Sequence, residues 1–276
     1  MLSFDLHCHS TRSDGLLAPA DVVVRAAQRG VRTLALTDHD EVSGLREARE
    51  RAADIGVNFI NGVEISVTWS GRTLHVVGLH IDSENPELTA GLGQIRGGRQ
   101  HRAESIASGL EDAGIEGSLA GARSYVTNPE LVGRTHFARF LVERGRASDV
   151  HSVFRKYLTV GKPGYVAHQW ASLEQAVHWI KASGGIAVLA HPGRYGLKNA
   201  ERESLLSSFG EMGGSAIEVV TGSHTPDQYA AWAGYARRFG LLASAGSDFH
   251  GPEESRRDFG ELPELPAGCT PVWQTF

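Results

Sequence analysis

Short apolar segments alternate with helical segments along most of this chain, and this alternation limits the folds that it can adopt. The apolar segments include RTLALT (32–37), IAVLAH (186–191), SAIEVV (215–220) and LLASAGSD (241–248). Strands that alternate with helices predict an α/β protein with a parallel sheet. Roughly seven such units are present, and no G-x-G-x-x-G phosphate-binding sequence follows the first strand, which favours a β/α barrel over a doubly wound sheet.

A helical region interrupts this alternation. Residues 86–161 contain helical stretches separated by Gly114, Gly133 and Gly145, and no obvious barrel strand. We therefore expect a barrel built from 1–85 and 162–276, with 86–161 as a helical insertion domain that contributes substrate specificity.

Composition excludes few functions. The net charge of −5 gives no reason to expect nucleic-acid binding through bulk charge, although it leaves room for a local basic groove. No secretory h-region or long apolar span is found, so we expect no membrane association and a cytoplasmic protein. Cys8 and Cys269 lie near opposite ends of the chain and fit free thiols. No obligate protein partner is indicated, and the oligomeric state stays open.

Residue types that bind metal ions recur where the predicted strands end. Eight such residues are found, and seven of them each lie at or near the end of a predicted strand. The exception is His75, which lies on the strand that follows a tight turn at 69–72. Active sites of β/α barrels lie at the C-terminal ends of the strands. The positions are, in chain order, His7, His9, His39, Glu64, His75, His191, Asp248 and His250.

Strand geometry predicts how two pairs of these residues meet. Alternate side chains of a strand point the same way, so His7 and His9 face one side and Cys8 the other. The same alternation puts Asp5 on the side of the histidines, where it could orient an imidazole. The first and last strands of a closed barrel are neighbours. Asp248 and His250, at the end of the last strand, can therefore reach His7 and His9.

The composition of this set indicates several metal ions. With Asp14 it holds six histidines and three carboxylates, which is too many for one tetrahedral ion. Two or three ions fit if Glu64 bridges a pair. Nitrogen and oxygen ligands suit Zn²⁺, Mn²⁺ or Fe²⁺ and argue against iron–sulfur or thiolate-zinc sites. Any single histidine here is more often a hydrogen-bonded structural residue, so the prediction depends on the whole set.

Several motifs resemble those of the polymerase-and-histidinol-phosphatase (PHP) family of metal-dependent phosphoesterases. They are DLHCHSTRSDG, LTDHDEVSG, GVEIS, HVVGLH, AVLAHPGRY, EVVTGSH and AGSDFH. The resemblance implies a distorted seven-stranded β/α barrel with three metal ions. The ligand sets that it implies are His7, His9, Glu64 and Asp248 for one ion, Glu64, His75 and His191 for the second, and Asp14, His39 and His250 for the third.

The resemblance also bears on the metal and on a neighbouring family. Some relatives have His where this chain has Asp14, and the added oxygen character favours manganese, with zinc and iron left open. Metal-dependent amidohydrolases also carry an H-x-H barrel, but they often use a modified lysine as the metal bridge. In this chain Glu64 occupies the place of the bridging lysine, which makes membership of the amidohydrolase family a less favoured interpretation.

Within the family, the segments GRTHFARFLVERG and GKPGYVAH are similar to the branch that acts on nucleotides and short RNA 5′ ends, although Thr135 stands where proline is usual. A strongly positive site prefers a phosphate dianion to a neutral amide. We expect a hydroxide that bridges two ions to attack phosphorus in line, and we expect His224 to contact the phosphate or to serve as acid.

The insertion is expected to recognise a second phosphate. Arginine pairs well with phosphate because its guanidinium donates two parallel hydrogen bonds. Tyr125, Tyr165 and Trp170 could stack on a base, although such aromatics are more often core. The predicted substrate contacts are Arg99, Arg102, Arg134, Thr135, His136, Lys162 and Arg194.

The leading functional hypothesis is removal of the 3′-phosphate from a nucleoside 3′,5′-bisphosphate. A 5′–3′ exonuclease that trims short RNA or DNA oligonucleotides needs the same chemistry and stays open, as does a histidinol-phosphate phosphatase. A hypothesis of a different class is a non-catalytic metal-binding or polymerase-associated module, against which the complete ligand set argues.

Overall fold

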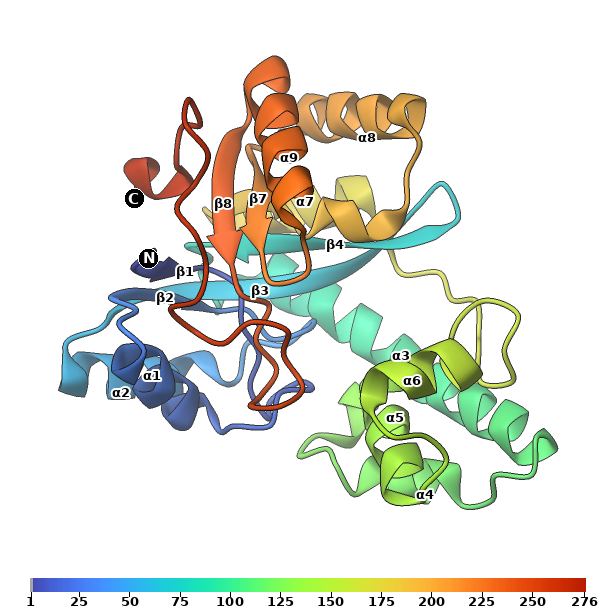
Figure 1. Ribbon diagram of the computed structural model, residues 1–276. Helices are drawn as coiled ribbons and strands as arrows, with labels where there is room; N and C mark the ends of the chain where they lie inside the picture. Colours follow the sequence, from blue (N-terminus) through green and yellow to red (C-terminus); the bar gives the residue numbers. More distant parts are fainter. Residues whose placement is uncertain (1) are drawn as a thin grey trace.

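The computed structural model describes residues 2–276 and shows a barrel-shaped sheet with helices around it (Figure 1). Seven strands follow one another around the barrel in the order β1-β2-β3-β4-β6-β7-β8, and a short β5 pairs with β3. Their bounds are β1 Phe4–Asp5, β2 Thr33–Leu36, β3 Asn58–Trp69, β4 Arg72–Leu79, β5 Ala171–Ser172, β6 Ile186–Leu189, β7 Ala216–Thr221 and β8 Leu242–Gly246.

The chain after β1 closes the barrel against β8. The Leu6 amide donates to the Ala245 carbonyl at 3.0 Å, and the Asp248 amide donates to the His7 carbonyl at 2.9 Å. An isolated parallel bridge joins Cys8 to Phe249. This closure confirms the predicted seven-stranded α/β barrel and brings the two ends of the sequence together.

β4 is the distorted part of the barrel, because it runs antiparallel to both β3 and β6. The tight turn predicted at 69–72 makes β3 and β4 a long hairpin that extends beyond the barrel (Figure 1). Glu64 therefore does not end its strand, as the sequence suggested, but lies within β3. Gly62 lets β3 pass close to β2, since a Cβ there would lie 2.7 Å from Thr37 Cγ2 and 2.9 Å from the Leu36 carbonyl oxygen.

The outer helices start and stop where local sequence signals lie. Ser172 and Gln175 form the capping box that begins α7, and Gly56, with a φ of 74°, ends α2. Among residues 2–276 no helix has both the length and the apolar character to cross a membrane. The helices around the barrel are α1 Pro19–Gln28, α2 Leu45–Ile55, α7 Leu173–Ala182, α8 Asn199–Glu211 and α9 Pro226–Phe239, with short turns at η3 Pro192–Tyr195 and η4 Val272–Thr275.

The remaining helices form a second body, here called the helical layer. It consists of α3 Pro86–Asp112, α4 Ser118–Arg123, η1 Pro129–Leu131, α5 Arg134–Glu143, α6 Val150–Val153 and η2 Phe154–Leu158. The second half of α3, including Ile106 and Leu110, packs with Phe137 of α5 in a separate apolar cluster. The first half, including Leu88 and Leu92, packs in the core of the barrel. α3 thus belongs to both bodies and fixes one against the other.

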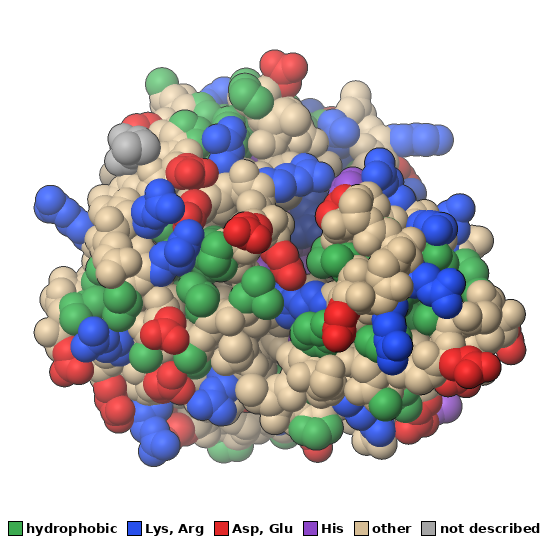
Figure 2. Space-filling model, turned by 60° about the horizontal axis from the view of Figure 1, so that its bottom comes forward, with side chains coloured by type: hydrophobic (Ala, Val, Ile, Leu, Met, Phe, Trp, Pro, Cys, Tyr) green, Lys and Arg blue, Asp and Glu red, His purple; other side chains and the backbone are tan. Residues whose placement is uncertain are grey.

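The barrel and the helical layer meet at a hollow. Figure 2 shows this face hollowed near its centre, with Lys and Arg side chains in the hollow and Asp and Glu side chains at its edge.

Candidate metal centre

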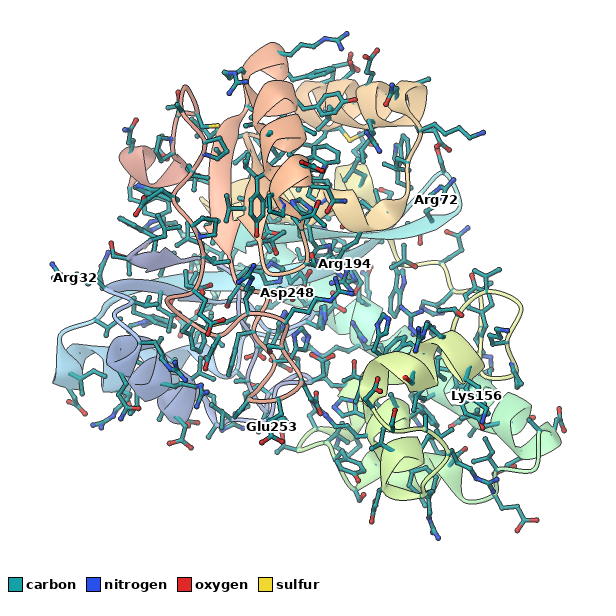
Figure 3. All side chains as sticks on the ribbon, viewed as in Figure 1. Arg32, Arg72, Lys156, Arg194, Asp248 and Glu253 are labelled. Carbon is teal, nitrogen blue, oxygen red and sulfur yellow. The ribbon has the colours of Figure 1, made fainter. Side chains whose placement is uncertain are left out.

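The nine predicted metal-ligand residues converge at one end of the barrel. They come from the segments after β1, β2, β6 and β8 and from within β3 and β4. Because β4 is antiparallel, the half of it that carries His75 lies at the end where the parallel strands finish. Figure 3 places Asp248 beside Arg194 near the middle of the molecule, where the barrel faces the helical layer. The nine are His7, His9, Asp14, His39, Glu64, His75, His191, Asp248 and His250.

Four possible ligand atoms surround one candidate cation position, here called the first point; the second and third points are the positions of the other two candidate cations. His7 Nε2 lies 3.2 Å from His9 Nε2, 3.3 Å from Glu64 Oε2 and 3.5 Å from Asp248 Oδ1. His9 Nε2 lies 3.3 Å from each of the two carboxylate oxygens. Ligand atoms about 2.1 Å from a cation at the corners of a tetrahedron lie about 3.4 Å from one another. The five separations given are close to this value, so the four atoms could serve as ligands of one cation.

Glu64 has a second oxygen that faces a different pair of imidazoles. Its Oε1 lies 2.8 Å from His75 Nδ1 and 2.9 Å from His191 Nε2, and these two nitrogens are 3.3 Å apart. The carboxylate is fully buried, with one oxygen turned to each point. This is the arrangement that a carboxylate bridging two cations requires.

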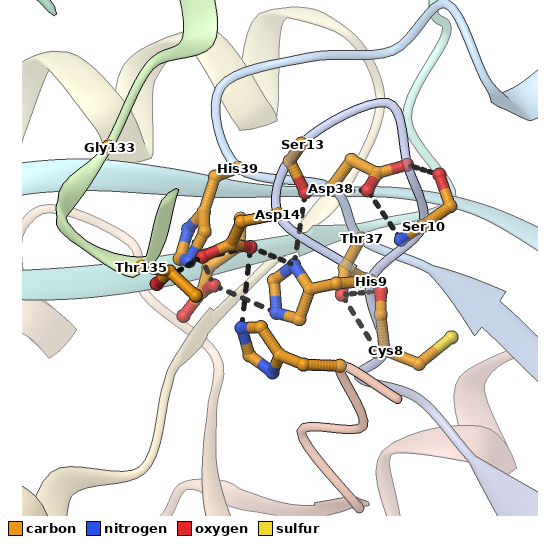
Figure 4. Close-up of polar contacts among 12 residues, drawn as sticks. Cys8, His9, Ser10, Ser13, Asp14, Thr37, Asp38, His39, Gly133 and Thr135 are labelled. Atoms are coloured by element: carbon orange, nitrogen blue, oxygen red, sulfur yellow. Dashed lines mark hydrogen bonds and ion pairs between the residues drawn. The ribbon is translucent and has the colours of Figure 1, made fainter. Parts of the chain in front are cut away.

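A third group lies around Asp14 (Figure 4). Asp14 Oδ1 is 3.3 Å from His250 Nε2, 3.9 Å from His39 Nε2 and 4.0 Å from His9 Nδ1. These side chains are wider apart than those of the first group, but their ligand atoms still lie within one coordination sphere.

The centre is strongly coupled electrostatically. Burial alone would raise the pKa values of Glu64 and Asp248, but nearby imidazoles hold both well below their usual range. Burial would likewise lower the pKa of His9, but Asp248 and Glu64 raise it to about 10. The buried carboxylates Glu64 and Asp248 thus stay ionised, and their negative charges keep His9 protonated. A metal cation could replace that proton.

Two buried oxygens show that the residues fit metal ions. Glu64 Oε2 and Asp14 Oδ1 make no hydrogen bond within the described part of the chain. Each oxygen instead faces imidazole nitrogens: His39 Nδ1 lies 2.9 Å from Glu64 Oε2, and His250 Nε2 lies 3.3 Å from Asp14 Oδ1. Cations at the first and third points would satisfy both oxygens, and oxygen and nitrogen donors suit divalent ions.

The acid that orients His7 is Glu218, which was not among the predicted residues. Glu218 Oε1 lies 2.7 Å from His7 Nδ1, and Glu218 Oε2 accepts from the His191 amide at 2.6 Å. Asp5, predicted for this role, instead holds the backbone: its Oδ1 accepts from the amides of Ser247 and His7. A glutamate within the apolar strand SAIEVV was the signal that could have identified Glu218.

The loops that carry the ligands are held by buried carboxylates and have strained backbones. Asp38 accepts from the Ser10 amide at 2.7 Å and from the Ser13 hydroxyl at 2.6 Å, which folds the chain between His9 and Asp14. His191 and Asp248 have positive φ angles of 27° and 57°. Such conformations are rare outside glycine and persist where surrounding contacts impose them.

Two predicted phosphate contacts on α3 differ in their partners. Arg99 and Arg102 are both nearly buried, with guanidinium carbons 4.8 and 5.2 Å from the centre of the Trp170 ring. Arg99 donates to Asp40 and to the Ser66 hydroxyl. No carboxylate in residues 2–276 pairs with Arg102, and its Nε lacks a hydrogen bond.

The other predicted cations are spread between the site and the surface. Burial and the charges of Arg194 and Arg99 lower the pKa of Arg134, so these arginines lie close enough to repel one another. Arg194 is half exposed and donates to Asp248 Oδ2 at 2.9 Å. Lys162 is exposed on the turn after η2, and its ammonium makes no hydrogen bond or ion pair within the described chain.

Two further predicted substrate contacts lie in the first turn of α5. The Thr135 hydroxyl donates to Asp14 Oδ2 at 2.9 Å (Figure 4). His136 is buried, and its Nδ1 accepts from the Gly133 amide at 3.0 Å. Of the possible stacking residues, Tyr125 packs in the cluster of the helical layer, and Arg99 covers Trp170.

The structure argues against the predicted role of His224. Its Nε2 accepts from the Gly193 amide at 2.9 Å, and its Nδ1 lies 3.1 Å from the Val219 carbonyl oxygen. Both ring nitrogens are thus taken by backbone groups, and the ring is buried. His224 holds the turn that carries Arg194 and has no nitrogen left for a phosphate or a leaving group.

Known proteins place this chain in one family. The PHP domain family matches residues 5–181. A 3′,5′-nucleoside bisphosphate phosphatase of Chromobacterium violaceum is 53% identical over 274 residues, which are 99% of this chain and 96% of that protein. The chain therefore belongs to the PHP domain family.

Further relatives are similar over nearly their full length. The 5′-3′ exoribonuclease Rnm of Escherichia coli is 46% identical over 275 residues, 99% of this chain and 93% of that protein. A solved structure from Chromobacterium violaceum, described as an amidohydrolase with bound sulfate and no metal, is 52% identical with a TM-score of 0.97. The match covers 99% of this chain and 95% of that chain.

Proposed function

We propose that this chain is a metal-dependent phosphoesterase that removes the 3′-phosphate of a nucleoside 3′,5′-bisphosphate. The observation that carries the proposal is a cluster of nine nitrogen and oxygen donors, together with two arginines, Arg102 and Arg134, that pair with no carboxylate of residues 2–276. The similarity to a nucleoside bisphosphate phosphatase over almost the whole chain supports it. The relative of known structure binds sulfate, which is a tetrahedral dianion like phosphate.

The nine clustered residues would hold up to three divalent cations, with Glu64 shared between the first and second. Divalent cations supply Lewis-acid stabilisation of phosphoryl oxygens and lower the pKa of bound water to about 7. Two aspartates and a glutamate among six imidazoles fit Mn²⁺, and Zn²⁺ or Fe²⁺ could replace it. Glu218 would keep the His7 ring turned so that Nε2 faces the first cation.

The arginines would hold the two ends of the substrate. Arg102 and Arg134 have no carboxylate partner among the described residues, and burial lowers the pKa values of both. A phosphate dianion would relieve their mutual repulsion and accept paired hydrogen bonds. Arg194, half exposed beside Asp248, can turn towards the phosphate that reacts. One nucleotide would thus lie between the metal centre and the helical layer.

A 5′–3′ exonuclease is the second candidate. It would hold the 5′-phosphate of an oligonucleotide in the same arginines and cleave the next phosphodiester. The hollow face in Figure 2 and the similarity to an exoribonuclease favour this possibility. A cytoplasmic location is part of either proposal, because both cysteines are free thiols.

The test is product release from a panel of substrates. The metal-free protein would be reloaded with Mn²⁺, Zn²⁺ or Fe²⁺ and given adenosine 3′,5′-bisphosphate, 3′-AMP, 5′-AMP, a 5′-phosphorylated trinucleotide and histidinol phosphate. We expect inorganic phosphate from the bisphosphate in preference to either monophosphate, and Arg134→Met should raise KM more than it lowers kcat. Arg32→Met is the matched exposed control, since Arg32 precedes β2 at the other end of the barrel (Figure 3), and it should leave KM unchanged.

Two results would contradict the proposal. Equal kcat/KM for the bisphosphate and for 3′-AMP would show that no second phosphate is recognised. Release of mononucleotides from the trinucleotide at a higher kcat/KM than phosphate from the bisphosphate would favour the exonuclease.

A further inference from the structure

Helix α5 holds the loop that carries Asp14. The Thr135 hydroxyl donates to Asp14 Oδ2 at 2.9 Å, and Arg139 Nη2 donates to the Asp14 carbonyl oxygen at 2.6 Å. Residues four apart share one face of a helix, so both contacts come from the same side of α5. The side chain and the backbone of Asp14 are therefore both held by the helical layer.

The same helix face reaches the loop that carries His250. Arg139 pairs with Glu254 at 2.7 Å, and Glu254 lies four residues after His250. His250 and Asp14 face each other across the third point at 3.3 Å. α5 thus connects two loops that contribute to one candidate cation site.

The Thr135 hydroxyl is not needed to cap α5. The Gly133 amide, at the start of the helix, donates to His136 Nδ1 at 3.0 Å. Thr135 is instead turned to Asp14, and it leaves Asp14 Oδ1 as the buried oxygen without a hydrogen bond. One oxygen of the carboxylate is fixed, and the other is presented to the imidazoles of His39 and His250.

We propose that Thr135 is a positioning residue for the third cation. Its hydroxyl holds Asp14 Oδ2 and leaves Oδ1 facing His39 and His250, where the third cation would bind, so the occupancy of that site would depend on helix α5. The neighbouring Arg134 is one of the arginines proposed to bind a substrate phosphate. The first turn of α5 would therefore contribute both to cation binding and to substrate binding. This inference rests on the proposed metal centre.

The test is Mn²⁺ binding to the full-length chain without substrate. Ions would be removed with a chelator, and stoichiometry and affinity measured by calorimetry and elemental analysis. Thr135→Val keeps the shape of the side chain and removes the hydroxyl. We expect wild type to bind three ions and Thr135→Val to bind one of them about 10–100-fold more weakly, as for other residues that orient metal ligands. Thr135→Ser should restore binding.

Two controls separate positioning from general damage. Thr127 also donates a hydroxyl from the helical layer to the same loop, at 2.8 Å, but to the Thr11 carbonyl oxygen. Thr127→Val should therefore bind Mn²⁺ as wild type does. In an Asp14→Ala background, which lacks the third site, Thr135→Val should not change the affinities of the remaining ions.

Wild-type binding of three ions together with unchanged affinities in Thr135→Val would overturn this inference and leave the proposed function standing. Failure of Thr135→Ser to restore binding would overturn it as well. Binding of fewer than three ions by the wild type would remove the three-ion centre itself, and the inference with it.

Discussion

Arg99 and Arg102 should respond in opposite directions to the same substitution. They lie three residues apart on α3, both are nearly buried, and both lie over Trp170. Arg99 is paired with Asp40, whereas no carboxylate of the described chain pairs with Arg102. We predict that Arg102→Met stabilises the free protein and that Arg99→Met destabilises it.

The magnitudes follow from the surroundings of each guanidinium. Burial, followed by the charges of Arg134 and Arg99, lowers the pKa of Arg102 from 12.5 to about 9. At about 1.4 kcal/mol for each pH unit, the charged form is disfavoured by on the order of 5 kcal/mol. A lowered pKa of a cation costs stability at every pH below the folded value, so the cost is fully present at pH 7. Loss of the contact with Trp170 offsets about 1–2 kcal/mol.

The net gain expected for Arg102→Met is therefore about 1–3 kcal/mol after local relaxation. Arg99→Met leaves Asp40 buried without its cation, and breaking a buried ion pair costs about 3–5 kcal/mol. Asp40 also accepts from the Ser66 amide at 2.7 Å, so its charge cannot simply move to solvent.

The assay is urea unfolding of the metal-free protein at pH 7, with and without inorganic phosphate. Phosphate should stabilise wild type more than Arg102→Met, because the variant lacks one of the cations that would bind it. Destabilisation of more than about 1 kcal/mol by Arg102→Met would refute the argument from its lowered pKa. Equal protection of both proteins by phosphate would refute its role in anion binding.

Three further predictions concern the metal centre. Because Asp248 and Glu64 raise the pKa of His9 to about 10, the stability that its proton supplies is fully present below pH 6.5 and is lost as pH rises through 10. Cation binding should therefore release protons at pH 7, and cation affinity should increase with rising pH. Calorimetry in buffers of different ionisation enthalpy measures the protons released, and the absence of proton release would contradict the prediction. Glu218→Gln should weaken cation affinity about 10–100-fold, with the exposed Glu211→Gln unchanged in the same titration. Glu64→Ala should lose at least one ion by elemental analysis together with phosphatase turnover, and intact turnover in the metal-replete variant would exclude a bridging role.

Local sequence signals predicted much of the barrel and the place of the candidate site. The alternation of strands and helices, the capping box at Ser172 and the turn at 69–72 are all found in the structure. The alternation of side chains along a strand was enough to put His7 and His9 on one side and Cys8 on the other. These signals are reliable because they depend on residues that are close in sequence.

The sequence could not predict which group each side chain contacts. His224 was expected to reach substrate, but the turn at Gly193 and the carbonyl of Val219 take both ring nitrogens. Glu218, rather than Asp5, orients His7, and the two residues of that contact are separated by 211 positions. Alternation along a strand gives the direction of a side chain, but not the neighbour that it meets.

The sequence alone determined the strands and helices, their number around the barrel, and the residue types offered at its C-terminal end. Tertiary structure alone decided that Arg99 has a carboxylate partner, that Arg102 has none within residues 2–276, and that Thr135 faces Asp14. The physical reason is that periodicity is set by local backbone geometry, whereas partners are set by barrel closure and by the packing of α3 and α5 against it.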